Sequence, residues 1–168
     1  MRHYLLFKCS LIVLLITVFN IGTKAQSNYI CDCVEVKKHK GSSNIDLCSD
    51  ANLPESKRVE MIACLLRLKG DRSPFWGVAT NNSVSQTFGP SPLEVVALFN
   101  ISYIFYGNKD FADAMVLVDE DGKQNSNESI DIAYKAYKKW FKTVKKIGLE
   151  EARKQKLDPL DGSGVRWY

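Results

Sequence analysis

The sequence is poor in the residues on which most enzyme mechanisms depend. Only two of its 168 residues are histidines, and His39, in a polar stretch, is the only one after residue 25. A Ser-His-Asp or Cys-His mechanism needs a histidine base beside its nucleophile. The G-x-S-x-G and H-E-x-x-H motifs, a P-loop and the dinucleotide-binding fingerprint are also missing. These absences argue against the common nucleophilic hydrolases, zinc proteases and nucleotide-dependent enzymes.

Apolar runs long enough to cross a bilayer are missing too. The run from about Cys9 to Ile21 is shorter than the roughly 20 residues that a membrane span needs. Arg2 and Lys8 precede this run, and Thr23-Lys24-Ala25 supplies small residues for a cleavage site. This order predicts a secretory signal peptide over residues 1–25, with an uncleaved signal anchor as the alternative. We therefore expect an exported protein, periplasmic or secreted, without a membrane span after cleavage.

Cleavage after Ala25 leaves residues 26–168, a size typical of a single domain. Three basic residues and no acidic one leave with the signal peptide, so the formal net charge falls from +4 to +1. The overall charge of the mature chain therefore predicts no partner, and only local charge is informative. Within this domain we expect an irregular arm over residues 26–52 and a helical core over residues 53–168.

Four cysteines remain after cleavage, and an even number in an exported chain predicts disulfides. They are Cys31, Cys33, Cys48 and Cys64. A bridge between Cys31 and Cys33 would close a very tight ring. Each of the two should therefore pair with Cys48 or Cys64, in an order that the sequence leaves open. The alternative is a zinc site formed by Cys31, Cys33, Cys48 and His39, but C-x-C lacks the usual spacing of a zinc knuckle. We expect two structural disulfides and neither a metal ion nor another cofactor.

Three segments have the start and stop signals of helices. The first begins near Pro54. The second begins with the capping-box pattern Ser91-Pro92-Leu93-Glu94, is apolar on nearly every side, and ends at Gly107. The third has Asn127 as its expected cap and ends at Gly148, and a shorter helix should follow it. The predicted fold is all-α, a small bundle of about four to five helices around the central apolar helix, with a disulfide-tied N-terminal arm.

The third helix has an amphipathic pattern with a strongly basic side. Apolar residues recur at steps of three and four along one face. Lysines occupy the other face, namely Lys135, Lys138, Lys139, Lys142, Lys145 and Lys146. Lysines often serve only to keep such a helix soluble. As a functional alternative, they bind another protein or an anionic surface of the envelope. Nucleic acid is not the expected partner, because the aromatic residues lie opposite the lysines rather than between them.

Two further groups of residues are candidates for a site. Phe75 and Trp76, in the loop from Asp71 to Gly89, either anchor a partner or fold back over the core. Two carboxylates from the set Glu94, Asp110 and Asp119 would suffice for cell-wall hydrolysis, if the fold placed them on either side of one bond. For Glu94, the capping box is a competing explanation.

Taken together, these patterns predict an exported, non-catalytic interaction protein. An inhibitor or immunity-type protein acting in the cell envelope is one concrete form of this prediction. The alternative, from a different class, is a small cell-wall-directed hydrolase that uses paired carboxylates.

Overall fold

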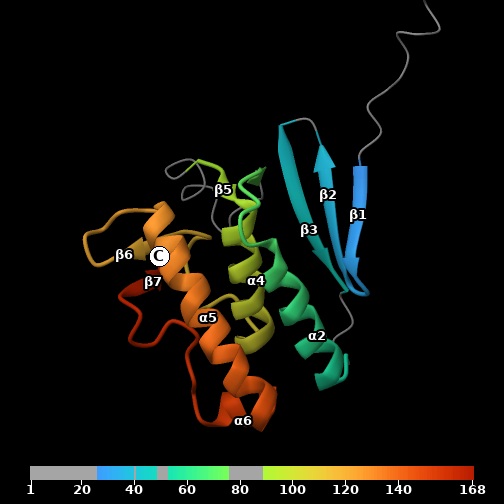
Figure 1. Cartoon of the computed structure of the whole chain (residues 1–168), viewed down its shortest axis with the longest axis vertical. Coiled ribbons are helices and arrows are strands. Elements are labelled where there is room, and N and C mark those ends of the chain that lie inside the picture. Colours follow the sequence, from blue (N-terminus) through green and yellow to red (C-terminus); the bar gives the residue numbers. More distant parts are fainter. Residues whose placement is uncertain (1–25, 40, 49–52, 76–88) are drawn as a thin grey trace, which may run out of the picture.

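Helix α4 (Leu93–Tyr106) lies at the centre of the computed structural model, which describes residues 26–39, 41–48, 53–75 and 89–168. Helix α2 (Glu55–Leu65) and a three-stranded sheet lie on one side of α4, and α5 (Asn127–Ile147) lies on the other (Figure 1). Most of the side chains of α4 are buried, around nearly its whole circumference. A helix that is apolar on all sides is stable in water only when other elements enclose it. The expected central helix is therefore present, and the other elements pack around it.

The N-terminal segment forms strands rather than an irregular arm. Strands β1 (Gln26–Cys31), β2 (Val34–His39) and β3 (Ser42–Leu47) form an antiparallel sheet in the order β1-β2-β3. Val34, Val36 and Ile45 are buried in the core, and Val36 lies opposite Ile45. On the outer face, Lys37 pairs with Asp46 at 2.6 Å. Because alternate residues of a strand point to opposite sides, one face of this sheet joins the core and the other meets solvent.

The prediction of an all-α fold is therefore wrong, and the structure is a mixed α/β fold. Two smaller antiparallel pairs add to the three-stranded sheet. Strand β4 (Pro74–Phe75) pairs with β5 (Ser91–Pro92), and β6 (Leu117–Asp119) pairs with β7 (Val165–Trp167). All these strands are short, and the buried alternation in β2 extends over only two valines. Such a pattern is too brief to distinguish a strand from an irregular segment.

One disulfide connects the sheet to α2, and a second connects the turn after β1 to the end of β3. Cys31 pairs with Cys64 of α2, and Cys33 pairs with Cys48 after β3. As predicted, Cys31 and Cys33 pair with different cysteines, and the structure defines which partner each one has. The two bridges join residues 33 and 15 positions apart. In the chain-entropy model, closing a loop of this size stabilises the folded state by about 3 kcal/mol per bridge, because it restricts the unfolded chain. All four sulfur atoms are in bridges, so none is left as a thiolate ligand for the alternative zinc site.

The start of α4 differs from the predicted capping box. Pro92 is the N-cap residue and no side chain caps the helix. The Ser91 hydroxyl instead donates to the carbonyl of Met115 at 2.6 Å. Glu94 Oε2 accepts the N–H of Gly70 at 2.7 Å. Both side chains of the predicted motif are therefore used in contacts with other parts of the chain.

The other helices lie where the sequence places them. Helix α2 is followed by a short 3₁₀ turn, η1 (Leu66–Leu68). Ser126, one residue before the expected cap, is the N-cap of α5, and its hydroxyl accepts the N–H of Ser129. Helix α5 ends at Gly148, as predicted, and α6 (Leu149–Lys154) follows directly.

The junction between α5 and α6 depends on glycine. The Glu55 carboxylate at the start of α2 accepts the N–H of Leu149, which satisfies one of the free donors at the start of α6. Gly148 has φ 91° and ψ 156°, a conformation that is essentially restricted to glycine. A Cβ atom at this position would lie 2.9 Å from Glu55 Oε1. Gly148 thus supplies both the backbone conformation and the space that Glu55 needs.

We expect Gly148→Ala to lower the free energy of unfolding by about 2–3 kcal/mol, because it strains the backbone and displaces Glu55. The matched control is Gly107→Ala. Gly107 also has a positive φ, of 78°, but no atom lies within 4 Å of its added Cβ, and we expect a loss of about 1 kcal/mol. Urea unfolding followed by circular dichroism measures both values. Equal losses would contradict the role given to the Glu55 contact.

Candidate binding surfaces

Helix α5 presents its lysines to solvent because its opposite face is fixed in the core. Ile130, Tyr134, Tyr137 and Val144 are fully buried, and this sets the rotation of the helix about its axis. All six predicted lysines are exposed, namely Lys135, Lys138, Lys139, Lys142, Lys145 and Lys146. With 3.6 residues per turn and a rise of 1.5 Å per residue, they span about 120° of the helix surface and about 16 Å of its length. We call these six residues the lysine face.

The charges of the lysine face are not neutralised within the described part of the chain. None of the six side chains forms a salt bridge with a described carboxylate. By contrast, Lys69 pairs with Asp131, near the start of α5, at 2.6 Å. Lys145 Nζ lies 5.4 Å from the centroid of the Phe141 ring, a cation–π contact that does not cancel its charge. Lys135 helps, after Lys69, to lower the pKa of the Asp131 carboxyl, so part of its charge acts within the protein. The lysine face otherwise keeps its charge for an external anion.

A groove runs along one edge of the lysine face, between α5 and the segment 155–163. Its volume is about 670 Å³, within the range of ordinary ligand sites. Lys135 and Lys139 line it, whereas the other four members of the lysine face do not. Ile132, Ala136 and Leu157 are half-buried and give the groove an apolar floor. We call this hollow the α5 groove.

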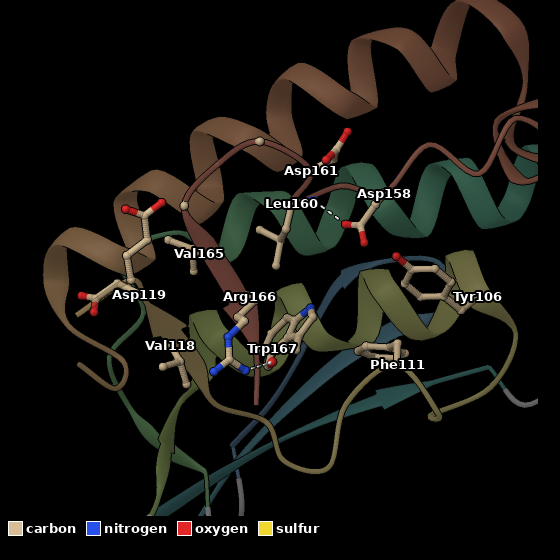
Figure 2. Close-up of a pocket in the computed structure, with 13 residues that line it drawn as sticks. Tyr106, Phe111, Val118, Asp119, Asp158, Leu160, Asp161, Val165, Arg166 and Trp167 are labelled. Atoms are coloured by element: carbon tan, nitrogen blue, oxygen red, sulfur yellow. Dashed lines mark hydrogen bonds between the residues drawn. The ribbon is translucent and has the colours of Figure 1, made fainter. Parts of the chain in front are cut away.

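A second hollow, of about 470 Å³, shares part of its wall with the α5 groove (Figure 2). Asp158, Asp161 and Gly162 line both. Aromatic side chains and four carboxylates dominate its lining, namely Tyr106, Phe111 and Trp167 together with Asp119, Glu120, Asp158 and Asp161. Arg166 is the only described basic residue in that lining. We call this hollow the acidic cavity.

Ring contacts and hydrogen bonds fix the aromatic wall of the acidic cavity. Tyr106 stacks on Phe111 with the ring centroids 5.2 Å apart, and Phe111 meets Trp167 at 6.2 Å. The indole N–H of Trp167 donates to the hydroxyl of the buried Tyr137 at 3.1 Å. Burial, together with the charge of Asp158 and a hydrogen bond to it, raises the pKa of Tyr106 above its ordinary value. The phenol therefore stays protonated beside Asp158.

The carboxylates considered for hydrolysis do not gather at this cavity. Asp119 lines it, but Glu94 and Asp110 do not. Asp119 and Asp158 lie at opposite ends of the cavity, with Leu160 between them (Figure 2). A glycosidase needs two carboxyl groups about 5–9.5 Å apart, on either side of one bond. The expected set supplies only one of them here, Asp119, which favours binding over bond cleavage by these carboxylates.

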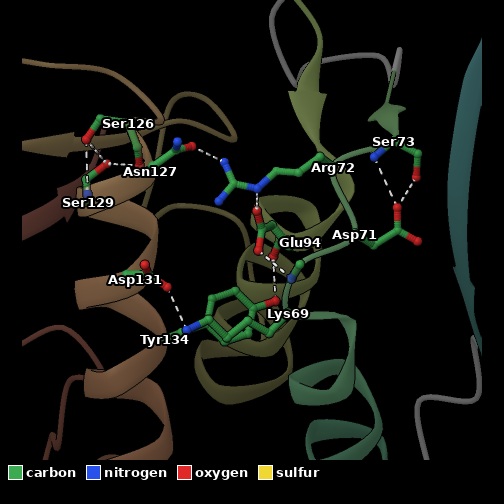
Figure 3. A network of polar contacts seen from close by, with 11 residues as sticks. Lys69, Asp71, Arg72, Ser73, Glu94, Ser126, Asn127, Ser129, Asp131 and Tyr134 are labelled. Atoms are coloured by element: carbon green, nitrogen blue, oxygen red, sulfur yellow. Dashed lines mark hydrogen bonds and ion pairs between the residues drawn. The ribbon is translucent and has the colours of Figure 1, made fainter.

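Glu94 is the buried member of a polar network that joins three parts of the fold (Figure 3). Its side chain is 1% exposed and pairs with Arg72, which also donates to Asn127 at the start of α5. The Tyr134 hydroxyl donates to the backbone carbonyl of Glu94 at 3.0 Å. Burial, and then the charge of Glu94, raises the pKa of Tyr134 above its ordinary value, so this donor keeps its proton. The network connects the segment after η1 to both α4 and α5, and the role of Glu94 is therefore structural.

Of the two loop aromatics expected as partner anchors, Phe75 is the one that the structure describes. It lies in β4, is half-buried, and packs against the core. This matches the alternative in which a loop aromatic folds back. Trp76 lies outside the described residues, and so does the side chain of His39, so the prediction for Trp76 stays a prediction.

Neither hollow was expected from the sequence. The acidic cavity combines residues 106–120 with residues 158–167, and the α5 groove combines α5 with residues 155–163. No motif or spacing relates these segments. The lysine repeat was visible because it lies within one helix, whereas the hollows depend on how the C-terminal segment returns past α4 and α5.

No protein-family model matches the chain, and no curated protein or solved structure is significantly similar to it. Within the parts of the chain that the structure describes, no helix combines the length and the apolar composition needed to cross a bilayer. The surfaces themselves are therefore the basis for a functional assignment.

We expect Arg72→Gln to destabilise the protein by about 2 kcal/mol, because it leaves the buried Glu94 carboxylate without its cation. The loss should be below that of a fully buried pair, since the Arg72 side chain is 45% exposed. Lys69→Gln is the matched control: it removes an exposed ion pair with Asp131 and a contact of 5.9 Å with the centroid of the Tyr134 ring. It should cost less than about 1 kcal/mol, because such exposed contacts are weak. Chemical denaturation at neutral pH measures both values. A smaller loss for Arg72→Gln than for Lys69→Gln would contradict the structural role of the network.

Proposed function

We propose that the mature chain is an exported binding protein without catalytic activity, which recognises an acidic partner through the lysine face. One observation carries the proposal: six exposed lysines, without described carboxylate partners, lie on a helix whose opposite face is fixed in the core. A surface that is already ordered loses little conformational entropy on binding. Concentrated charge of one sign attracts a partner of the opposite sign. The partner is another protein or an anionic surface of the cell envelope.

Two further observations support this role. The disulfides Cys31–Cys64 and Cys33–Cys48 are compatible with an oxidising, extracytosolic compartment, in line with the predicted signal peptide. Glu94 and Asp110, two of the three carboxylates expected for hydrolysis, do not line the acidic cavity, which favours binding over hydrolysis. An inhibitor or immunity-type protein that covers an acidic surface of an envelope-directed enzyme is one concrete form of this proposal.

The lysine face is tested by replacing Lys138, Lys142 and Lys145 with glutamine. The triple variant should leave a heparin column at clearly lower salt than the parent protein, and it should bind vesicles that contain phosphatidylglycerol more weakly. Surface charges act over about 8–10 Å at moderate ionic strength, so three neutral side chains weaken the attraction at this face. Elution salt and vesicle co-sedimentation are the two measurements.

The matched control removes the same amount of charge from elsewhere on the surface. Lys109, Lys123 and Lys154 are exposed and lie outside α5. Lys123 and Lys154 each form an exposed ion pair, with Asp121 and Glu151. Replacing these three with glutamine lowers the net charge equally and should change retention much less. Equal shifts for the two triple variants, or no shift for the α5 variant, would contradict the proposal, because retention would then depend on total charge or on another surface.

The alternative function, a cell-wall-directed hydrolase, is tested at the acidic cavity. Under the binding proposal, neither the parent protein nor its Asp119→Asn and Asp158→Asn variants should clear a suspension of purified peptidoglycan. Lysozyme serves as the positive control for clearing. Clearing by the parent protein that both substitutions abolish would instead support hydrolysis by these two carboxylates.

A further inference from the structure

The α5 groove is preformed, because its two walls are bonded to each other. The indole N–H of Trp140, on α5, donates to the carbonyl of Leu157 at 2.8 Å, and the Trp140 side chain is largely buried. Pro159 and Leu160 of the same segment are also buried. The C-terminal segment is therefore held at a fixed separation from the helix, with Ile132 and Ala136 forming part of the floor between them.

The groove is basic along the lysine side. Lys135, Lys139 and Lys156 line it and have no described carboxylate partner within salt-bridge distance. Of the two aspartates that also line it, Asp158 accepts the N–H of Leu160 at 2.7 Å and faces Tyr106 in the acidic cavity (Figure 2). Its charge is therefore directed toward the cavity. Asp161, the other aspartate, is exposed and offsets part of the positive charge. Three lysines against this one carboxylate leave the groove basic, which suits an anion that lies next to the apolar floor.

Polar groups on both sides of the groove distinguish between two kinds of occupant. Thr143, Gln155 and Ser163 line it in addition to the lysines. The Gln155 amide donates to Glu151, and the Ser163 hydroxyl bonds the backbone of Val165, but each group keeps a further acceptor position, as the Thr143 hydroxyl does. A hydrocarbon tail would cover these positions without offering them a hydrogen bond, which costs free energy for each group. A peptide offers both N–H donors and carbonyl acceptors along its backbone. The mixed lining thus favours a peptide over an acyl chain.

We infer that the α5 groove binds an acidic segment of a partner protein, with one apolar side chain on its floor and a neighbouring carboxylate on Lys135 and Lys139. This inference rests on the proposed function, since it identifies the partner of the lysine face as a protein and assigns the point of contact. The remaining members of the lysine face then contribute long-range attraction rather than direct contacts.

The probe is a random twelve-residue peptide library displayed on phage, selected on the exported, oxidised protein. Enriched peptides should share a large apolar residue next to one or more acidic residues. The most enriched sequence is then synthesised, and its Kd for each variant is measured by fluorescence anisotropy. A charge-assisted hydrogen bond is lost in Lys139→Gln, which should raise the Kd by about tenfold.

Two variants make the test specific. Lys138→Gln removes the same charge one residue away, outside the groove, and should change the Kd by less than about twofold. Thr143→Trp fills the groove from an exposed position of α5 and should abolish peptide binding without unfolding the protein. Circular dichroism and thermal unfolding of each variant verify that the fold is intact.

Each other outcome overturns the inference. Failure to enrich peptides, enrichment without the acidic and apolar pattern, equal effects of Lys138→Gln and Lys139→Gln, or binding that survives Thr143→Trp would remove the groove as a peptide site. Binding of dodecanoate that Thr143→Trp abolishes, with no peptide enriched, would replace the peptide with a lipid. Retention on heparin separates failure of the peptide site from failure of the proposed function. If the α5 triple variant is retained less strongly than the parent protein, the lysine face still binds anions although the peptide site has failed.

Discussion

The burial of α4 is the constraint on which the rest of the structure depends. A helix enclosed on nearly all sides leaves few of the polar groups at its ends to water, so other parts of the chain must satisfy them. At its start, Leu93 and Glu94 donate their N–H groups to the carbonyls of Ser73 and Asp71, at 2.9 and 3.0 Å. At its end, the Arg153 guanidinium donates to two carbonyls of the last turn, each at 2.6 Å. These hydrogen bonds hold residues 71–73, before α4, and Arg153, after α5, against the two ends of α4.

The position of the lysine face follows from the same constraint. The buried face of α5 packs toward α4, where the Tyr137 hydroxyl bonds the Ser102 hydroxyl and Trp167 donates to both. Arg72 connects the start of α5 to the start of α4 through Asn127 and Glu94. With its rotation set in this way, α5 has only one face left for solvent. The basic character of that face is a property of the sequence, but its rigidity comes from the core.

The helices could be predicted because their signals are local. Periodicity, length and a terminal glycine located α4 and α5, with Gly107 and Gly148 at their ends. The sheet could not be predicted, since its core face uses few apolar residues. It also depends on disulfides between distant cysteines: one links β1 to α2, and the other links the turn after β1 to the end of β3. Likewise, the lysine face was predictable from spacing alone. The α5 groove and the acidic cavity were not predictable, because each requires contacts between segments that are distant in the sequence. For the same reason, the sequence did not predict that Ser91 and Glu94 would bond Met115 and Gly70 instead of forming a capping box.

Asp158, Asp161 and Gly162 form a partition with a different environment on each side: the basic groove on one and the aromatic, acid-lined hollow on the other. A partition of single-chain thickness cannot move on one side only. Any occupant that displaces it from the groove changes the shape of the hollow as well, and the reverse holds with the same free energy, because linkage between two sites is reciprocal. The hydrogen bond from Trp140 to Leu157, three residues after the end of α6, holds the start of this partition against α5.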